Sequence, residues 1–306
     1  MKSSLYFLLS IAIISVLTLS SCGGEDPKNM DSGPSSESSK PKAKASGSSV
    51  LKVGDKLFNL PSPLETAMLI EEVGGHFNES MLNPVVDAGQ YSVKIKQAMN
   101  LGVYGADLGY CLIYNQSQKA FTLLATTKKL GTELGISPAL YKGLMKRFEG
   151  NMENKDSLLI FVSELNRLSD EYLKENESED LSAMILYGGW VESLYFVSEL
   201  SKSLDNDALR ARVGEQKNTL VNLIGLITQQ NSDGRFDDIL ASLNDLKASF
   251  AKVNSTYSYF EPETKPDQKL TIIKSKSSVE LDNALMEEIS NKITALRKNI
   301  ITTSAS

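Results

Sequence analysis

Residues 236–253 read FDDILASLNDLKASFAKV, and apolar side chains recur in this stretch every three or four positions. Because an α-helix has about 3.6 residues per turn, this spacing places the apolar side chains in one stripe along a helix. The stripe consists of Phe236, Ile239, Leu243, Leu246, Phe250 and Val253. The stretch therefore predicts an amphipathic helix that buries one face against other helices.

Three further stretches have the same apolar spacing. Their apolar positions are Leu158, Phe161, Leu165, Leu168 and Tyr172, then Leu209, Val213, Leu220, Ile224 and Ile227, and finally Leu281, Leu285, Ile289, Ile293, Leu296 and Ile300. Short breaks rich in Gly, Asn, Ser and Asp separate such stretches, which favours antiparallel neighbours. We therefore predict an all-α fold, a multi-helix bundle of about eight antiparallel helices.

The helix ends also have recognisable sequences. Ser62, Pro63 and Glu65 form an N-cap, a first-turn proline and a capping-box acid, which predict a helix start. Ser277 and Glu280 are expected to introduce the C-terminal helix. Other helices are expected at residues 92–115, 118–134 and 138–150, and the one long non-helical stretch at residues 261–276, with strand potential at residues 271–273.

A weak internal repeat leaves a second architecture open. Five residues match five others at a constant offset of 85 positions. The first set is Ala98, Met99, Leu101, Asp107 and Tyr110, and the second is Ala183, Met184, Leu186, Glu192 and Tyr195. A duplication of helical pairs would suit a TPR-like superhelical arrangement, whereas chance similarity between two apolar helices is the alternative.

The N-terminus has the pattern of an export signal. Lys2 precedes an uncharged apolar run over residues 5–19, which is typical of a signal peptide. Residues 19–22, LSSC, resemble the lipobox of bacterial lipoproteins of the Bacteroidota type. The resemblance implies cleavage after residue 21 and lipid, including palmitate, on Cys22. It also implies a lipid-anchored place in the cell envelope, at the outer membrane, either periplasmic or exposed on the surface. A permanent membrane helix and a plain secretory peptide are the alternatives.

The composition divides the remaining chain into a tether and a domain. Residues 22–50 are expected to be a flexible tether behind the lipidated cysteine, since 15 of the 27 residues from 23 to 49 are Gly, Pro or Ser. Residues 51–306 are expected to form an all-helical soluble domain. Cys111 is the only other cysteine, which excludes a disulfide framework once Cys22 is lipidated. The net charge of −6 disfavours nucleic acid as a partner.

Two acidic residues stand alone within apolar runs. Asp107 lies in LGVYGADLGYCLIY and Glu192 in MILYGGWVESLYFV, so we expect both carboxyl groups to be more than half buried. Tyrosines share their helical faces, and a buried acid among hydroxyl groups can bind a polar ligand. The candidate ligand-binding residues are Tyr104, Asp107, Tyr110, Glu192 and Tyr195. In the alternative interpretation each acid accepts hydrogen bonds from tyrosine or pairs with a Lys or Arg from a neighbouring helix.

Other features limit the chemistry. His76 is the only histidine, which excludes a two-histidine metal site, and we expect neither a metal nor a cofactor. Gly102, Gly105 and Gly109 indicate either tight helix packing or a ligand groove. Trp190, between Gly189 and Val191, fills the core or floors a pocket.

These observations favour a non-catalytic module. Residues 61–70 (PSPLETAMLI) and 99–110 (MNLGVYGADLGY) resemble stretches of uncharacterised all-helical lipoproteins of the same bacteria, a resemblance that implies no activity. We expect a membrane-anchored extracytoplasmic lipoprotein that binds a protein or a small ligand in the cell envelope. An architectural component of the cell envelope is the alternative, and a hydrolase that uses Asp107 and Glu192 is the third interpretation.

Overall fold

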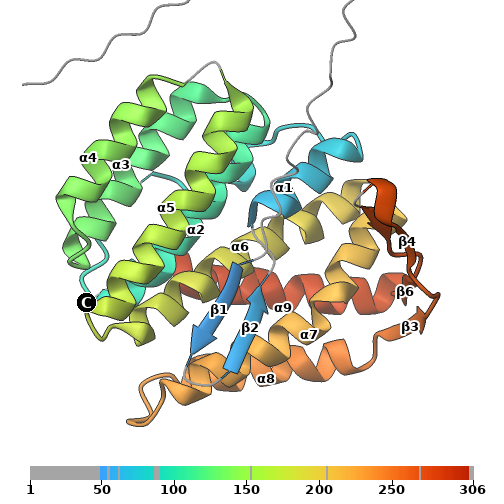
Figure 1. The fold of residues 1–306 in the computed structure, drawn as a ribbon. Helices are drawn as coiled ribbons and strands as arrows, with labels where there is room; N and C mark the ends of the chain where they lie inside the picture. The colour runs from blue at the N-terminus through green and yellow to red at the C-terminus, as the bar shows by residue number, and fades with distance from the viewer. Residues whose placement is uncertain are drawn as a thin grey trace, which may run out of the picture. The chain divides into compact units, whose positions relative to one another are not determined.

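The computed structural model describes residues 49–53, 56–60, 63–85, 90–151, 154–204, 206–268 and 270–302. Cleavage after residue 21, the lipid on Cys22 and most of the expected tether therefore lie outside the described residues. Within them the chain forms nine α-helices, which confirms the predicted all-α fold (Figure 1). The helices are α1 (Pro63–Glu72), α2 (Lys94–Ile113), α3 (Ser117–Glu133), α4 (Pro138–Glu149), α5 (Lys155–Glu175), α6 (Glu179–Ser203), α7 (Asp207–Gln229), α8 (Asp237–Ala251) and α9 (Asn283–Ile301).

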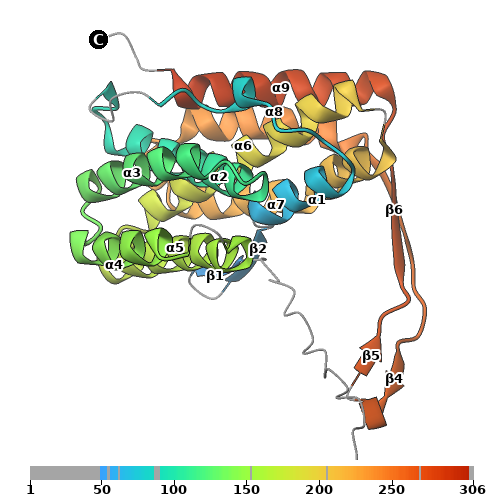
Figure 2. The same ribbon diagram turned by 90° about the horizontal axis from the view of Figure 1, so that it is seen from above.

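Six short strands pair into three antiparallel two-stranded sheets among the described residues. The sheets are β1 (Ser49–Val53) with β2 (Lys56–Leu60), β3 (Asn254–Ser258) with β6 (Lys276–Glu280), and β4 (Glu263–Lys265) with β5 (Leu270–Ile272). The β3–β6 ribbon extends away from the helices and carries β4 and β5 toward its far end (Figure 2). Of the strand potential predicted at residues 271–273, residues 271 and 272 lie in β5.

Local sequence explains most helix boundaries. Pro138 occupies the first turn of α4, and α3 ends before Gly135, whose φ of +93° suits a residue without a Cβ. The expected start of the C-terminal helix was wrong, because Ser277 and Glu280 lie in β6. The cap is instead Asp282, whose carboxylate accepts the N–H of Leu285 at 2.7 Å.

Helices α2 and α6 form the centre of the bundle. Both contact α1, α5 and α9, and they also pack against each other. Figure 2 shows α8 and α9 on one side of these central helices and α4 and α5 on the other. In a TPR-like superhelix each helical pair contacts only its neighbours along the chain. Helix α9 packs against α2 and α6, and neither of these is its neighbour along the chain. The TPR-like alternative is therefore not confirmed.

Two glycines let the central helices approach closely. A Cβ on Gly102 would lie 2.0 Å from the carbonyl oxygen of Ile185, and one on Gly188 would lie 1.9 Å from that of Met99. Both contacts are backbone contacts, so a larger residue would force the helices apart. For Gly102 the expectation of tight helix packing is confirmed. None of the helices in the described ranges has both the length and the hydropathy needed to cross a bilayer.

Candidate functional site

The two predicted acids meet at a third residue in the bundle core. Asp107 on α2 and Glu192 on α6 are fully buried, at 0% exposure, which confirms the expected burial. Glu192 accepts two hydrogen bonds from Arg297 of α9, from Nε to Oε2 at 2.6 Å and from Nη2 to Oε1 at 2.7 Å. The same Nη2 donates to the carbonyl oxygen of Met81 at 2.9 Å. This bidentate pair joins α6, α9 and the segment before α2.

Asp107 is held differently from Glu192. Its Oδ2 accepts the backbone N–H of Asn83 at 3.2 Å, whereas Oδ1 has no donor beside it among the described residues. Burial raises the pKa of Asp107 well above its usual value, and the nearby charge of Glu192 raises it further. Burial also raises the pKa of Glu192, while the hydrogen bonds and charge of Arg297 oppose that shift. The two acids lie within hydrogen-bonding reach of each other, and because the pKa of Asp107 is raised well above its usual value, we infer that Asp107 holds the proton while Glu192 faces Arg297.

The three predicted tyrosines also have partners within the protein. The Tyr104 hydroxyl donates to the carbonyl oxygen of Pro84 at 3.0 Å. The Tyr110 hydroxyl donates to that of His76 at 3.3 Å and accepts the N–H of Asn78 at 3.1 Å. Tyr195 lies under the guanidinium of Arg297, 4.2 Å from the ring centroid. The first two tyrosines therefore hold residues 76–84 onto α2, and only Tyr195 joins the acids.

This geometry favours the alternative interpretation for Glu192, an acid paired by a basic residue from a neighbouring helix. An acid/base pair in a hydrolase must reach its substrate, whereas neither carboxyl group is exposed and neither lines a described cavity. The ligand role of the five predicted residues stays a prediction. Arg297 was missed, although its position four residues after Ile293 placed a charge on the apolar face of the C-terminal stripe.

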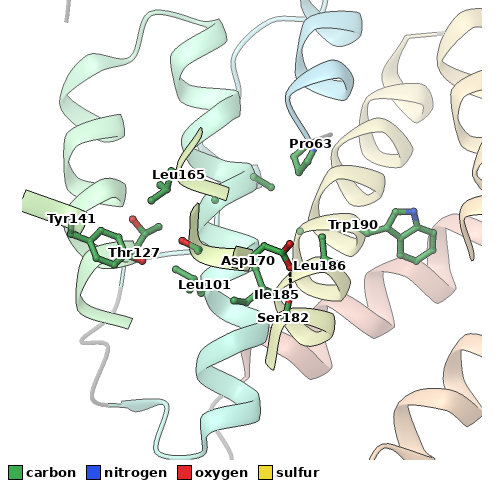
Figure 3. Close-up of a pocket in the computed structure, with 15 residues that line it drawn as sticks. Pro63, Leu101, Thr127, Tyr141, Leu165, Asp170, Ser182, Ile185, Leu186 and Trp190 are labelled. Atoms are coloured by element: carbon green, nitrogen blue, oxygen red, sulfur yellow. Dashed lines mark hydrogen bonds between the residues drawn. The ribbon is translucent and has the colours of Figure 1, made fainter. Parts of the chain in front are cut away.

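A different set of side chains surrounds a cavity of about 80 Å³ between α2, α5 and α6 (Figure 3). Helices α1, α3 and α4 each add one residue to its wall. Most of the wall is apolar or glycine. The lining residues are Pro63, Leu101, Gly102, Gly105, Ala106, Thr127, Tyr141, Leu165, Ser169, Asp170, Ser182, Ile185, Leu186, Gly189 and Trp190.

Small residues on the central helices make room for this cavity. Gly105 and Ala106 of α2 and Gly189 of α6 present little or no side chain to it. Two of the three α2 glycines for which the sequence left a ligand groove open, Gly102 and Gly105, line this hollow, whereas Gly109 does not. Trp190 contributes to the wall, but its indole turns toward α7 and donates from Nε1 to Oε1 of Gln216 at 3.1 Å (Figure 3).

Most polar groups around the cavity already have partners. Ser182 Oγ donates to Asp170, which also pairs with Lys174 Nζ at 2.6 Å. Thr127 Oγ1 donates to the carbonyl oxygen of Leu124 at 2.9 Å. Tyr141 is fully buried, and its hydroxyl makes no hydrogen bond of good geometry within the described residues. Burial raises the pKa of Tyr141, with Ser169 beside it as the opposing influence, so the hydroxyl keeps its proton.

The remaining candidate groups have no evident chemistry. Cys111 is buried, and burial raises the pKa of its thiol to about 12, so it is not an activated nucleophile. No group of three or more His, Cys, Asp or Glu side chains in the described residues is arranged to hold a metal ion.

Comparison with known proteins gives no match to a family model, to a curated protein or to a solved structure.

Proposed function

We propose that the protein is a lipid-anchored, extracytoplasmic binding module, and that the cavity between α2, α5 and α6 is its ligand site. The cavity is the observation that carries the proposal. Ligand sites are concave, mainly apolar and supplied with a few polar groups, and this cavity has each of those properties.

Energetics support a ligand in this cavity. An enclosed apolar void costs about 24 cal/mol per Å³, so this hollow of 80 Å³, which is partly open to solvent, costs at most about 2 kcal/mol. The small residues Gly105 and Ala106 leave the hollow unfilled, where larger apolar side chains would occupy it. A bound apolar ligand would recover this cost, because it restores contacts with the wall.

The N-terminal sequence supports the anchored location. Lys2, the apolar run over residues 5–19 and Cys22 form the export and lipidation pattern, and the Gly, Pro and Ser of residues 23–49 follow it. A flexible chain of that length reaches roughly 30 Å, which would hold the helical domain clear of the lipid headgroups. Two or three acyl chains on Cys22 would make the attachment stable.

The anchor is tested by labelling cells with radioactive palmitate. The wild-type chain is expected to take up label and to sediment with membranes, whereas Cys22→Ser is expected to do neither. Cys111→Ser is the matched control, since Cys111 is the only other cysteine and is expected to leave labelling intact. Label on Cys22→Ser, or its absence from the wild type, would remove the anchor from the proposal.

The ligand site is tested by filling the cavity. Ala106→Leu adds apolar volume inside it, and Ala241→Leu makes the same change at an exposed position on α8. Both variants and the wild type are incubated with a membrane extract, repurified and extracted with organic solvent for mass spectrometry. We expect a small molecule in the wild type and in Ala241→Leu that is absent from Ala106→Leu. Identical extracts from all three would argue against this cavity as the site.

An architectural component of the cell envelope is the second candidate, and the β3–β6 ribbon favours it. Tyr257, Tyr259 and Ile273 are 66, 68 and 75% exposed on this projection. Deleting the ribbon is expected to sensitise cells to detergent if the role is architectural, whereas Ala106→Leu would then have no such effect.

A further inference from the structure

We propose that the cavity takes a neutral, mainly apolar molecule with one hydrogen-bond-accepting oxygen, and that the Tyr141 hydroxyl donates to that oxygen. This inference rests on the proposed function, since it specifies the ligand class of the same cavity.

The charge of the wall selects for a neutral ligand. Asp170 is the only ionisable acid or base among the residues that line the cavity, and it is already engaged by Ser182 and Lys174. An anionic ligand would meet this carboxylate without any lining Lys, Arg or His to balance its own charge. A cationic ligand would lose its hydration for a carboxylate that already has a counter-ion. A neutral molecule avoids both costs.

The hydrogen bonds of the lining residues favour a ligand with a hydrogen-bond acceptor. The hydroxyl protons of Thr127 and Ser182 are directed to a backbone carbonyl and to a carboxylate, respectively. The buried hydroxyl of Tyr141 has no acceptor in good geometry among the described residues, and the Ser169 hydroxyl lies beside it. Buried polar groups in native proteins almost always have a partner, so an unpaired hydroxyl at a cavity indicates where a ligand oxygen belongs.

The placement of Tyr141 makes this hydrogen bond directional. Its ring packs over Gly131, where a Cβ would lie 2.0 Å from the hydroxyl oxygen, so the ring has little freedom to turn. Tyr141 and Thr127 lie on one side of the cavity and Pro63 and Trp190 on the other (Figure 3). A ligand would therefore place its oxygen on the α3 and α4 side and its apolar part against Leu101, Leu165 and Ile185.

The test uses three six-membered rings of nearly equal size with the full chain. Cyclohexane has no polar atom, tetrahydropyran has one acceptor oxygen, and piperidinium has a positive charge. Binding is followed by ligand-observed NMR, with the fluorescence of Trp190, the only tryptophan, as a reporter at the cavity wall. Each ring is titrated into the wild type, Tyr141→Phe, Ala106→Leu and Tyr187→Phe. The last is the matched control, because it removes a buried hydroxyl that does not line the cavity.

We expect cyclohexane and tetrahydropyran to bind the wild type, and piperidinium not to bind. Tyr141→Phe should weaken tetrahydropyran about fivefold, the ratio that corresponds to one net hydrogen bond, and should leave cyclohexane unchanged or tighter. Tyr187→Phe should change neither the tetrahydropyran affinity nor the cyclohexane affinity. A tetrahydropyran affinity that Tyr141→Phe does not change, while Ala106→Leu abolishes binding of both rings, would overturn this inference and leave the proposed function intact. Absence of binding to the wild type, or binding that Ala106→Leu does not reduce, would overturn both.

Discussion

Replacing Glu192 with Gln removes the counter-charge of a buried guanidinium. Glu192 is fully buried and the side chain of Arg297 is only 10% exposed, so solvent cannot compensate for the lost charge. Breaking a buried pair by removing one partner typically costs about 3 to 5 kcal/mol. Asp107 modifies this expectation, because it holds a proton that it can release. Once ionised, Asp107 can replace Glu192 as the counter-charge of Arg297. We therefore expect Glu192→Gln to lower the free energy of unfolding by about 3 kcal/mol, at the low end of this range.

Because Asp107 can replace Glu192 as the counter-charge, the effects of substituting the two acids on the free energy of unfolding should be strongly non-additive. Asp107→Asn alone mimics the protonated acid and keeps an oxygen for the N–H of Asn83, so at pH 7 it should raise the free energy of unfolding, because folding no longer has to protonate this carboxyl group. In the Glu192→Gln background the same change removes the replacement charge and should cost about 2 kcal/mol more than it does alone. Urea unfolding of the four chains at pH 7, followed by circular dichroism, gives these energies. Additive effects, or a Glu192→Gln cost below about 1 kcal/mol, would refute the proposed protonation of Asp107.

Three further predictions concern pH, the ribbon and the buried thiol. The folded-state pKa of Asp107 is raised above its unfolded value of 3.8, so its stabilising contribution is complete below that value and is lost as the pH rises through the folded pKa. The wild type should therefore lose stability relative to Asp107→Asn between pH 4 and pH 8, which thermal unfolding across that range measures. Replacing residues 259–275 with Asn-Gly leaves Ser258 and Lys276 joined by a two-residue hairpin turn and should shift the free energy of unfolding by less than about 1 kcal/mol, because β3 is exposed throughout. Urea titration would show a larger shift if the ribbon supported the bundle. In Cys22→Ser, Cys111 should react with Ellman's reagent at pH 8 only after urea is added, since its thiol is buried and its pKa is about 12; prompt reaction without urea would contradict this.

The apolar periodicity predicted the fold class and most helix positions, because burial of one helix face is a property of the local sequence. It predicted α3 and α4 almost to the residue, since proline and glycine mark their ends. It misplaced the start of α9, because pairing of β6 with a strand some 20 residues earlier is a non-local effect. Ser277 and Glu280 have the capping pattern, but both pair with residues of β3. Asp282 is therefore the N-cap of α9.

The candidate site was predictable only in part. The burial of Asp107 and Glu192 followed from their apolar surroundings. Their proximity did not, because it depends on the packing of α2 against α6, which the sequence did not predict. Neither spacing nor composition indicated that Arg297, more than 100 residues from Glu192, would reach it. The cavity wall draws on six helices, so Tyr141 and Leu165 are ordinary core residues when the sequence is considered alone.

Xenon binding decides whether the cavity accepts an apolar ligand. Xenon enters dry apolar cavities and scatters X-rays strongly, so a crystal of the full chain pressurised with the gas gives a direct answer. We expect a xenon peak between Leu101, Leu165 and Ile185 that is absent from Ala106→Leu. A wild-type cavity that contains ordered water, or side chains that close it, with no xenon at this position would show that the cavity does not accept an apolar ligand.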